Sequence, residues 1–393
     1  MSQTKAQLIS GTTAQDLTVD NINTTSINNG QTSGRKNLII NGAMNIAQRG
    51  TTTSQATGFL IDRFNVENGQ VDENSTVTQA DVTSGTTPYT LGFRKALKIQ
   101  NGNQTSGAGA GDYIQLFYRF EAQDIATSGW NYKSASSFIT LSFWLKSSVA
   151  QVFSGSLRSH DGTSLSYKFD TPSLSADTWT KVTYTIPGNS NLHFDNNAEN
   201  GLDIFIYPFI GTTFTSSNAN TETWITAATD TYANNMTTTW YTTNNATWEI
   251  TGMQFEVGSN ATDFEFRTFG DELALCQRYC CKWWNNGGTT ANHSRFPVGH
   301  TNSTSSMAFW LQHPVPMRTT DGKTITHNIG QIQPINQGAS QYNPAFTLTA
   351  DGQQELISMI QLGLQSGRTE NQIAYFRVGG GQTDWYLIIA NEL

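Results

Sequence analysis

Charged residues are scarce in this sequence. Asp, Glu, Lys and Arg make up only 13% of its 393 residues, about half the share found in an average soluble protein. The charges that exist are mostly acidic, giving a formal net charge of −8 at pH 7. Nucleic-acid binders need basic surface to neutralise phosphates, so the charge balance argues against that class. Disorder is also disfavoured, because aromatic residues reach 11%.

Long hydrophobic runs are also missing. No stretch of about 18 apolar residues occurs, which is the length that a membrane-spanning helix needs. The first ten residues, MSQTKAQLIS, lack the apolar core of a secretory signal peptide. We therefore expect no membrane insertion and a chain that is made in a cytosol.

Cysteine is rare and confined to one short stretch, at Cys276, Cys280 and Cys281. An odd, clustered set in a chain without a secretion signal argues against a disulfide framework. These residues could be combined with His293 into a zinc site, but the C-x3-C-C spacing is poor for structural zinc. We predict that the cysteines are small buried hydrophobic residues.

The sequence is rich in segments that alternate apolar and polar residues. Between about residues 64 and 266 they are separated by Gly, Asn, Ser and Thr turns, which is typical of a two-sheet antiparallel sandwich. In Phe138–Lys146, for example, one face carries Ile139, Leu141, Phe143 and Leu145, and the other carries Thr140, Ser142 and Trp144. The predicted strands are Lys95–Gln100, Tyr113–Phe120, Phe138–Lys146, Val152–Arg158, Thr180–Ile186, Leu202–Ile210 and Trp248–Val257.

A change of period follows the last of these strands. Trp248–Val257 alternates with one break at Gly252, and the apolar residues then recur three or four apart. This spacing, at Leu273, Cys276 and Cys280, predicts a short helix with one apolar stripe. We expect the helix to begin at Gly270 and Asp271, where the carboxylate can cap a backbone N–H. It is expected to be almost the only helix, and to mark a domain junction over residues 270–284.

Residues 37–64 carry a compact motif. Leu38, Ile39 and Ile40 form an apolar run that stops at the turn dipeptide Asn41-Gly42. Further along, the arginines Arg49 and Arg63 stand close to Asp62 in a chain with few charges. We interpret these three as a structural ion pair that braces a loop.

Two long motifs resemble one known group of proteins. The segments NLIINGAMNIAQRG and IDRF, then SFWLKSS, and the late segment WEITGMQFEVGSNATDFEFRTFGDELALCQRYCCKW are similar to tail-fibre and head-fibre appendage proteins of tailed bacteriophages. PVPMRTT at 314–320 and the final IIANEL also resemble that group. The matching residues are Asn41, Gly42, Met44, Gln48, Arg49, Gly50, Asp62, Arg63 and Phe64, then Glu272, Leu273, Cys276, Gln277, Arg278 and Tyr279.

The resemblance implies a homotrimer on the virion, with distal domains that touch the host surface. We expect it to mediate adhesion to a surface glycan. The resemblance also implies structural or oligomer roles for one set of residues: Arg49, Asp62, Arg63, Glu272, Leu273, Cys276, Arg278 and Tyr279. Residues 1–36 are polar and have too few apolar residues to bury a core. We therefore expect this arm to pack against other virion proteins or against its own symmetry mates, in a protein made in the host cytoplasm.

The expected architecture is mainly β. We predict an extended N-terminal anchor arm over 1–36, a jelly-roll sandwich over 37–269, the linking helix over 270–284 and a distal β-sandwich over 285–393. In the distal part the segment Gln353–Leu364 suits either a helix or a strand, and we favour a strand. Other distal strands are expected at Ser306–Gln312, Thr324–Ile329, Ala345–Leu348, Ile373–Val378 and Trp385–Ala390.

The sandwich also resembles jelly-roll carbohydrate-binding modules, which often hold a structural calcium. Here Asn45 stands near the Glu of those modules, and Thr251-Gly252 stand where acids recur. Calcium needs several charged oxygen ligands, so these departures argue against the site, and no cofactor is expected.

Aromatic residues in polar, loop-like surroundings are the candidate glycan ligands, because an exposed ring can stack on the apolar face of a sugar. The alternative is that each ring packs on the sandwich or on another chain. The candidates are Trp130, Tyr132, Trp224, Tyr232, Trp240 and Tyr241.

A glycosidase would need two carboxylates about 5–10 Å apart. No acidic pair has a spacing that singles it out among Asp161, Asp170, Asp177, Asp195, Glu199 and Asp203. There is no Gly-x-Ser-x-Gly elbow, and Gly379-Gly380-Gly381 opens no predicted helix. We therefore expect no enzyme. The alternatives are a virion enzyme that degrades polysaccharide and a purely structural adaptor or capsid decoration protein.

Overall fold

A computed structural model describes most of the chain. The described residues are 26–27, 30–31, 35–217 and 220–284, then 299–303, 306–320, 322–328, 332–335, 348–351, 357–363, 373–378 and 385–393. Most of the predicted anchor arm lies outside them, as do His293 and the glycines at 379–381. In the arm, the strands β1 (Ser26–Ile27) and β2 (Gly30–Gln31) pair with each other.

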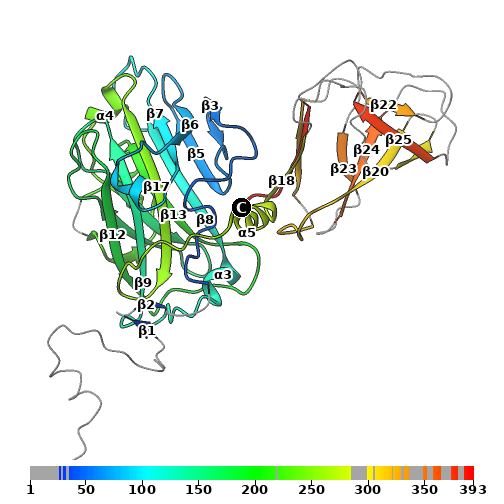
Figure 1. The fold of residues 1–393 in the computed structure, drawn as a ribbon. Coiled ribbons are helices and arrows are strands. Elements are labelled where there is room, and N and C mark those ends of the chain that lie inside the picture. Colours follow the sequence, from blue (N-terminus) through cyan, green and yellow to red (C-terminus); the bar gives the residue numbers. More distant parts are fainter. Residues whose placement is uncertain are drawn as a thin grey trace, which may run out of the picture.

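Two antiparallel sheets form the sandwich over residues 35–268, which confirms the predicted jelly-roll architecture (Figure 1). The first sheet has the strand order β15 (Trp224–Thr226), β11 (Leu165–Asp170), β10 (Ser154–Ser159), β13 (Asn200–Ile210), β8 (Tyr113–Glu121), β5 (Phe64–Gly69) and β4 (Thr57–Gly58). The second has the order β12 (Thr180–Pro187), β9 (Phe138–Ser147), β17 (Thr247–Val257), β7 (Lys95–Gln100), β6 (Thr76–Asp81) and β3 (Thr52–Thr53).

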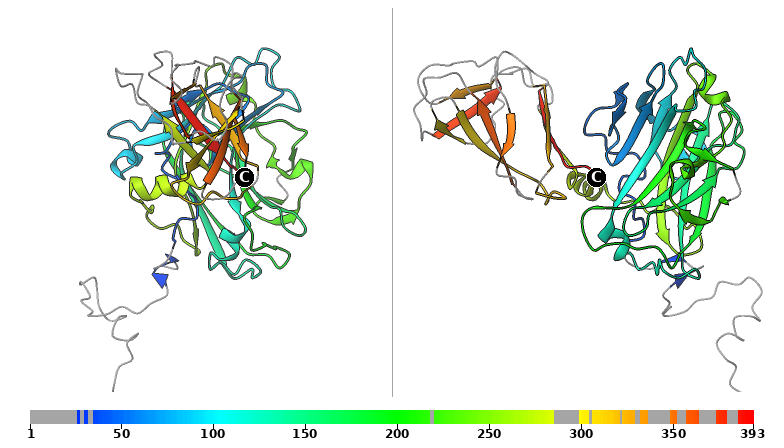
Figure 2. Two further views of the ribbon diagram at one scale, coloured as in Figure 1. Left: turned by 90° about the vertical axis from the view of Figure 1, so that its right-hand side faces the viewer. Right: turned by 180° about the vertical axis from the view of Figure 1, so that it is seen from behind.

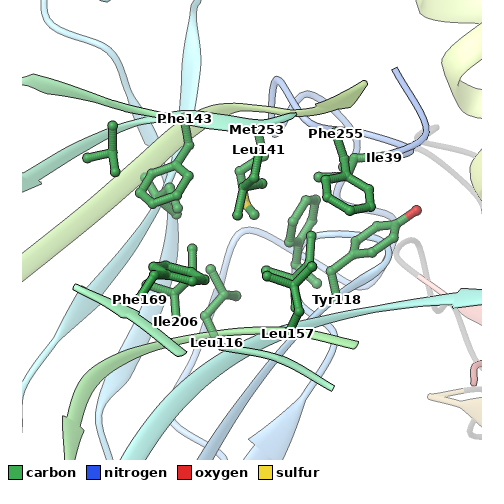
Figure 3. Close-up of a cluster of buried hydrophobic side chains, with 14 of the residues drawn as sticks. Ile39, Leu116, Tyr118, Leu141, Phe143, Leu157, Phe169, Ile206, Met253 and Phe255 are labelled. Carbon is green, nitrogen blue, oxygen red and sulfur yellow. The ribbon is translucent and has the colours of Figure 1, made fainter. Parts of the chain in front are cut away.

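The core lies between these sheets, where the apolar members of each alternating strand meet. On β9 the residues Ile139, Leu141, Phe143 and Leu145 are all fully buried. Figure 3 shows Leu141 and Phe143 facing Leu116 and Ile206 of the opposite sheet. Each large apolar side chain buried in this way stabilises the fold by about 1.5–3 kcal/mol.

The break in the pattern of β17 is a β-bulge. The register of β17 against β9 shifts between Thr251 and Gln254. Gly252 has a φ of 64°, in the left-handed region that glycine adopts at little cost. The bulge lets Met253 face the core after the break, where it is buried.

The structure contains several other short helices, so the expectation that the junction helix is almost the only one is wrong. They are α2 (Thr87–Thr90), α3 (Ala122–Ala126), α4 (Thr239–Thr242) and the 3-10 turn η2 (Thr229–Thr231). Each spans a loop between strands. In the part of the chain that the structure describes, no helix is both long and apolar enough to cross a membrane.

Part of the loop between β13 and β17 covers one end of the outer face of the first sheet. Its short strands β14 (Thr215–Ser216) and β16 (Ala233–Asn234) pair in parallel. The backbone N–H of Asn234 donates to Ser154 Oγ at 3.1 Å, and the Ser166 hydroxyl donates to the Thr231 carbonyl at 2.8 Å. Residues 211–217 and 227–236 are called the covering loop below.

The junction helix is α5 (Phe269–Gln277), shorter than the predicted 270–284. Its N-cap is Thr268 rather than Asp271, because the Thr268 hydroxyl accepts the backbone N–H of Asp271 at 3.3 Å. Residues 280–284, predicted to continue the helix, form the strand β18 (Cys280–Trp284) instead, so this part of the prediction is wrong. Its pairing with β26 (Tyr386–Ala390) overrides the helical spacing of the cysteines.

The second β region forms two sheets, called the distal module below. One has the order β18, β26 and β21 (Thr324–His327). The other runs β22 (Ile332–Ile335), β25 (Ile373–Val378), β19 (Gly299–Ser303), β20 (Ser306–Gln312), β24 (Ile357–Gly363) and β23 (Leu348–Asp351). The ambiguous segment Gln353–Leu364 contains β24, which confirms the preference for a strand.

The distal module lies between α5 and the last residues of the chain, which return to the sandwich. β18 leads away from α5 and β26 returns antiparallel to it, so the final residue lies beside α5 (Figures 1 and 2). The backbone N–H of Asn391 donates to the Tyr279 carbonyl at 2.7 Å, and the Arg318 N–H donates to the Arg278 carbonyl at 2.9 Å. Both ends of the module are therefore fixed at the same place.

Candidate functional site

The residues that carry the long motifs meet at this junction. Arg63 is buried, and its guanidinium lies 3.4 Å from the centre of the Tyr279 ring. Arg63 and Arg49 bind the two carboxylate oxygens of Glu392, at 3.0 and 2.9 Å. The expected ion pair with Asp62 is wrong, because Asp62 instead accepts the backbone N–H of Gln48 at 3.0 Å. Glu392 lies far from both arginines in the sequence, so no local sequence pattern predicts this ion pair.

The helix residues of the motif bind the sandwich. Arg278 donates two hydrogen bonds to the Glu121 carboxylate at 2.7 and 2.8 Å, and the Tyr279 hydroxyl donates to the same group. These donors hold the pKa of Glu121 below its usual value against the opposing effect of burial. Glu272 accepts the backbone N–H of Asn41, and Leu273 packs beside Cys276 against Ile40 and Ile46.

The cysteines are buried, unpaired thiols. Burial raises the pKa of Cys276 and Cys280, and raises that of Cys281 to about 12. A thiol with such a pKa is not a reactive thiolate at neutral pH. Among the described residues, no group of three or more His, Cys, Asp or Glu side chains is placed to hold a metal ion.

Most of the candidate glycan ligands turn out to be buried, so their expected exposure is wrong. Trp240 and Tyr241 have no exposed surface, Trp130 has 3% and Trp224 has 8%. Their polar atoms are occupied inside the fold: the Trp240 indole donates to the Thr247 carbonyl at 3.0 Å, and the Tyr241 hydroxyl to Asp112 at 2.9 Å. A buried ring has no face to offer a sugar.

Tyr132 and Tyr232 are half-buried and lie in different places. Tyr132 packs edge-on against Phe194, with ring centres 4.9 Å apart. Tyr232 belongs to the covering loop and lies edge-on to Phe205 of β13, at 5.9 Å. Of these rings, Tyr232 is the one that borders a cavity rich in aromatic side chains.

That cavity, the aromatic hollow, lies on the outer face of the first sheet. Its volume is about 280 Å³, near the lower end of ordinary ligand sites. Strands β5, β8 and β13 form its floor and the covering loop forms one wall. Its lining residues are Glu67, Tyr113, Gln115, Phe117, Arg119, Phe205, Ile210, Phe214, Thr229 and Tyr232.

Polar groups stand at fixed positions beside the rings. Glu67 accepts the Tyr113 hydroxyl at 3.0 Å and the Gln115 amide at 2.9 Å. Burial, with the Glu67 charge, raises the pKa of Tyr113 to about 12, so its hydroxyl stays protonated. The Arg119 guanidinium lies over Phe117 at 4.6 Å and donates to the Leu393 carbonyl at 2.8 Å.

Some polar atoms on this face lack a hydrogen-bond partner. They are Asn65 Oδ1, Arg119 Nε and Asp203 Oδ1, which are buried. The last two lie 3.6 Å apart, close enough for an ion pair but long for a hydrogen bond. Unsatisfied buried polar atoms cost free energy, and a ligand that supplies donors and acceptors would recover it.

The alternation in β8 is the sequence signal for this site. The core face of β8 carries Ile114 and Leu116, while the outer face carries Tyr113, Gln115, Phe117 and Arg119 in turn. Aromatic residues on the face that should be polar mark a surface with a further use. Aromatic residues in polar loops, by contrast, are buried in most cases.

Comparison with known proteins gives no family for this chain. No family model matches it, and no curated protein does.

Several solved structures are similar at a low level. One is the enzymatically active domain of tailspike protein 4 from bacteriophage CBA120, with 11% identity and a TM-score of 0.30; the match covers 56% of this chain and 21% of that one. Another is the N-terminal cellulose-binding domain of Cellulomonas fimi β-1,4-glucanase C, with 9% identity, a TM-score of 0.25, and 55% and 99% coverage.

A third is the family 11 carbohydrate-binding module of Clostridium thermocellum, in complex with a mixed-linked tetrasaccharide. It shares 14% identity at a TM-score of 0.23, over 53% of this chain and 94% of that one. The match to the tailspike domain spans about a fifth of that protein's length. The proposals below rest on the residues of this chain.

Proposed function

We propose that the protein binds glycans through the aromatic hollow. The observation that carries the proposal is a cavity in which the half-buried rings of Tyr113, Phe214 and Tyr232 stand beside Glu67 and Gln115. A sugar ring has apolar C–H faces and a rim of hydroxyls. Aromatic faces and a few fixed polar groups match that distribution, as they do in other small-molecule sites.

Arg119 also lines the hollow, and its guanidinium adds hydrogen-bond donors beside the rings. The hydroxyl groups of a sugar can accept from such donors. The low charge of the chain is consistent with a neutral or weakly charged partner.

A printed glycan array followed by calorimetry tests this proposal. We expect Tyr232→Ala and Gln115→Ala to weaken binding of the best glycan about tenfold each, through loss of a stacking ring and of a hydrogen-bond donor. Tyr132→Ala is the matched control, because its half-buried ring lies outside the hollow. Equal affinity in wild type and both hollow variants would rule the site out.

Binding is proposed without cleavage. The acidic side chains nearest the hollow already serve other groups: Glu67 accepts from Tyr113 and Gln115, while Asp203 accepts from His160 at 2.9 Å. Incubation with the bound polysaccharide, followed by sizing of the product, separates binding from degradation. Release of oligosaccharides would establish the enzyme alternative. No cofactor is part of the proposal.

A homotrimer is also proposed, assembled along α5. The helix borders an apolar groove of about 440 Å³, lined by Ala274, Leu275, Val315 and Pro316 between Asp271 and Arg278. Phe269 at its start is 65% exposed. Light scattering should give three times the chain mass, and Leu275→Asp should lower it. A monomeric wild type would contradict the trimer.

We also propose that the protein is part of a phage virion, as a head or tail appendage held through residues 1–36. The two long motifs support this location. Immunogold labelling of virions tests it, and a protein that lacks residues 1–30 should no longer join the particle. Attachment of that truncated protein would refute the anchor role. A virion that carries the protein without binding host glycan would favour the adaptor alternative.

A further inference from the structure

A larger cavity lies between the sandwich and the distal module. Its volume is about 620 Å³, within the range of ordinary ligand sites. One wall is the segment around β3 and β4, and the other is the sheet of β18, β26 and β21. This inter-module cleft is lined by Arg49, Thr52, Thr53, Gln55, Gly58, Phe59, Leu60, Gly322, Thr324, Thr326, Tyr386, Ile388, Ala390 and Glu392.

Strand register places the distal lining residues on one face. Thr326 pairs with Ile388 and Thr324 with Ala390, so both threonines lie beside the β26 residues that line the cleft. Tyr386 continues that row and pairs with Trp284 of β18, whose side chain is 57% exposed. Because alternate residues of a strand share a face, this row is fixed by the sheet itself.

The chemistry of the cleft is hydroxylic and aromatic. Threonines occupy both walls, and Phe59 and Tyr386 supply a ring on each side. The Thr324 hydroxyl makes a long hydrogen bond of 3.4 Å to the Ala390 carbonyl, which leaves its oxygen able to accept another. Gln55, an exposed amide, adds a donor and an acceptor.

The two charged residues that line the cleft, Arg49 and Glu392, bind each other. Arg49 binds Glu392 at 2.9 Å while its guanidinium lies 5.5 Å from the centre of the Phe59 ring. Lys282, on the same face of the distal sheet, lies over the rings of Tyr386 and Trp284 at 5.4 and 5.9 Å. An anionic ligand would have to compete for Arg49, so the lining favours an uncharged one.

We propose that the inter-module cleft is a second saccharide-binding site, which takes a neutral oligosaccharide segment. The proposal rests on glycan binding as the function of the protein and adds a site of different charge and size. A peptide fits less well, because the lining comes from side chains on the face of β21 and β26 and not from a free strand edge. Two sites on one chain raise the avidity for a repeating glycan.

Calorimetry on the full-length protein tests the second site. The probe is the neutral oligosaccharide that binds best on a printed glycan array. We expect two binding events per chain. Tyr386→Ala should weaken one of them about tenfold by removing a ring, while Tyr386→Phe should keep most of its affinity. Thr326→Trp, at an exposed strand position that tolerates aromatics, should block the same event by filling the cleft.

The controls separate this proposal from the first one. Tyr232→Ala should remove the other event, and Tyr132→Ala, a half-buried ring outside both cavities, should change neither. A single event that Tyr232→Ala abolishes and Thr326→Trp leaves intact would overturn the second site and leave glycan binding standing. No binding to any array glycan would overturn both. Binding in the cleft of peptides or of acidic glycans alone would also overturn the second site.

Discussion

Arg63 is the residue on which the junction depends most. Its φ of 73° places a non-glycine residue in the left-handed region, a conformation that costs free energy unless contacts hold it. Those contacts are the Tyr279 and Tyr118 rings, with centres at 3.4 and 5.1 Å, and the Glu392 carboxylate. The free-energy cost of removing the guanidinium from water is thus offset by its ion pair with a carboxylate and its contacts with two aromatic rings.

We expect Arg63→Met to lower the free energy of unfolding by about 3–5 kcal/mol, because it leaves part of a buried ion pair uncompensated. Urea unfolding measures this. Lys95→Met is the matched control, since Lys95 pairs with Asp81 at the surface and should matter little. Similar losses in the two variants would show that burial of Arg63 is not the cause.

Asp62 should give the protein an unusual dependence on pH. Burial raises its pKa to about 6, although Arg49 and the bonds from Gln48 oppose the shift. A carboxyl whose pKa is higher in the folded state holds its proton more tightly there. Its contribution to stability therefore falls as pH rises from about 4 to about 6, by about 2–3 kcal/mol in total.

The difference in unfolding free energy between wild type and Asp62→Asn isolates this effect, since other carboxyls titrate in both. We expect wild type to lose stability relative to the variant as the pH rises from 4 to 7. Glu121, whose pKa is lowered, contributes the opposite slope to both proteins. A constant difference across that pH range would contradict the assignment.

At the level of elements, β17 is the strand that joins the sandwich to everything after it. It pairs with β9 along most of its length and with β7 at its start. The bulge at Gly252 interrupts the pairing with β9, lies beyond the residues paired with β7, and is next to Phe93. After the bulge, the pairing with β9 resumes in a shifted register.

Gly252→Ala should cost about 1–3 kcal/mol of unfolding free energy. The new side chain meets a φ of 64°, and its Cβ would lie 2.7 Å from the end of the buried Phe93 ring. Gly270→Ala is the control: no atom lies within 4 Å of its added Cβ, and it lies in the first turn of α5. That variant should be neutral or slightly stabilising. Thermal unfolding of the two variants and the wild type measures these differences. Equal stability of the two variants would contradict the prediction.

At the level of the whole molecule, the sandwich and the distal module are joined twice. α5 and β18 lead out, and residues 391–393 return to contact the sandwich. Arg119 donates to the Leu393 carbonyl, and Arg318 donates to the Ala198 carbonyl at 2.8 Å. A cut at the predicted boundary after residue 284 would therefore not leave a complete sandwich.

A fragment of residues 35–284 should melt at a lower temperature than the sandwich in the full chain. It keeps Arg49 and Arg63 but lacks Glu392, so their buried charge is unpaired. Adding a peptide of residues 385–393 should restore part of the loss, which calorimetry can follow. A fragment as stable as the full chain would show that the returning segment contributes nothing.

Much of the architecture follows from local patterns. The alternation in Phe138–Lys146 assigned its core face correctly, and the break at Gly252 corresponds to the bulge. The helical spacing after Gly270 was right as far as Gln277 and wrong beyond it. Cys280, the last member of the predicted helix stripe, lies instead in β18, because that strand pairs with β26, about a hundred residues away in the sequence.

By itself, the sequence determined the mainly β fold, the sandwich strands and the burial of the cysteines, because alternation and turn chemistry act between near neighbours. Tertiary structure decided which aromatic rings are exposed to solvent and which charged residues form ion pairs. Trp240 looks like an exposed loop residue until α4 packs it into the core, and Arg63 meets Glu392 across 329 positions. Such contacts depend on how the chain closes in space, which no local pattern records.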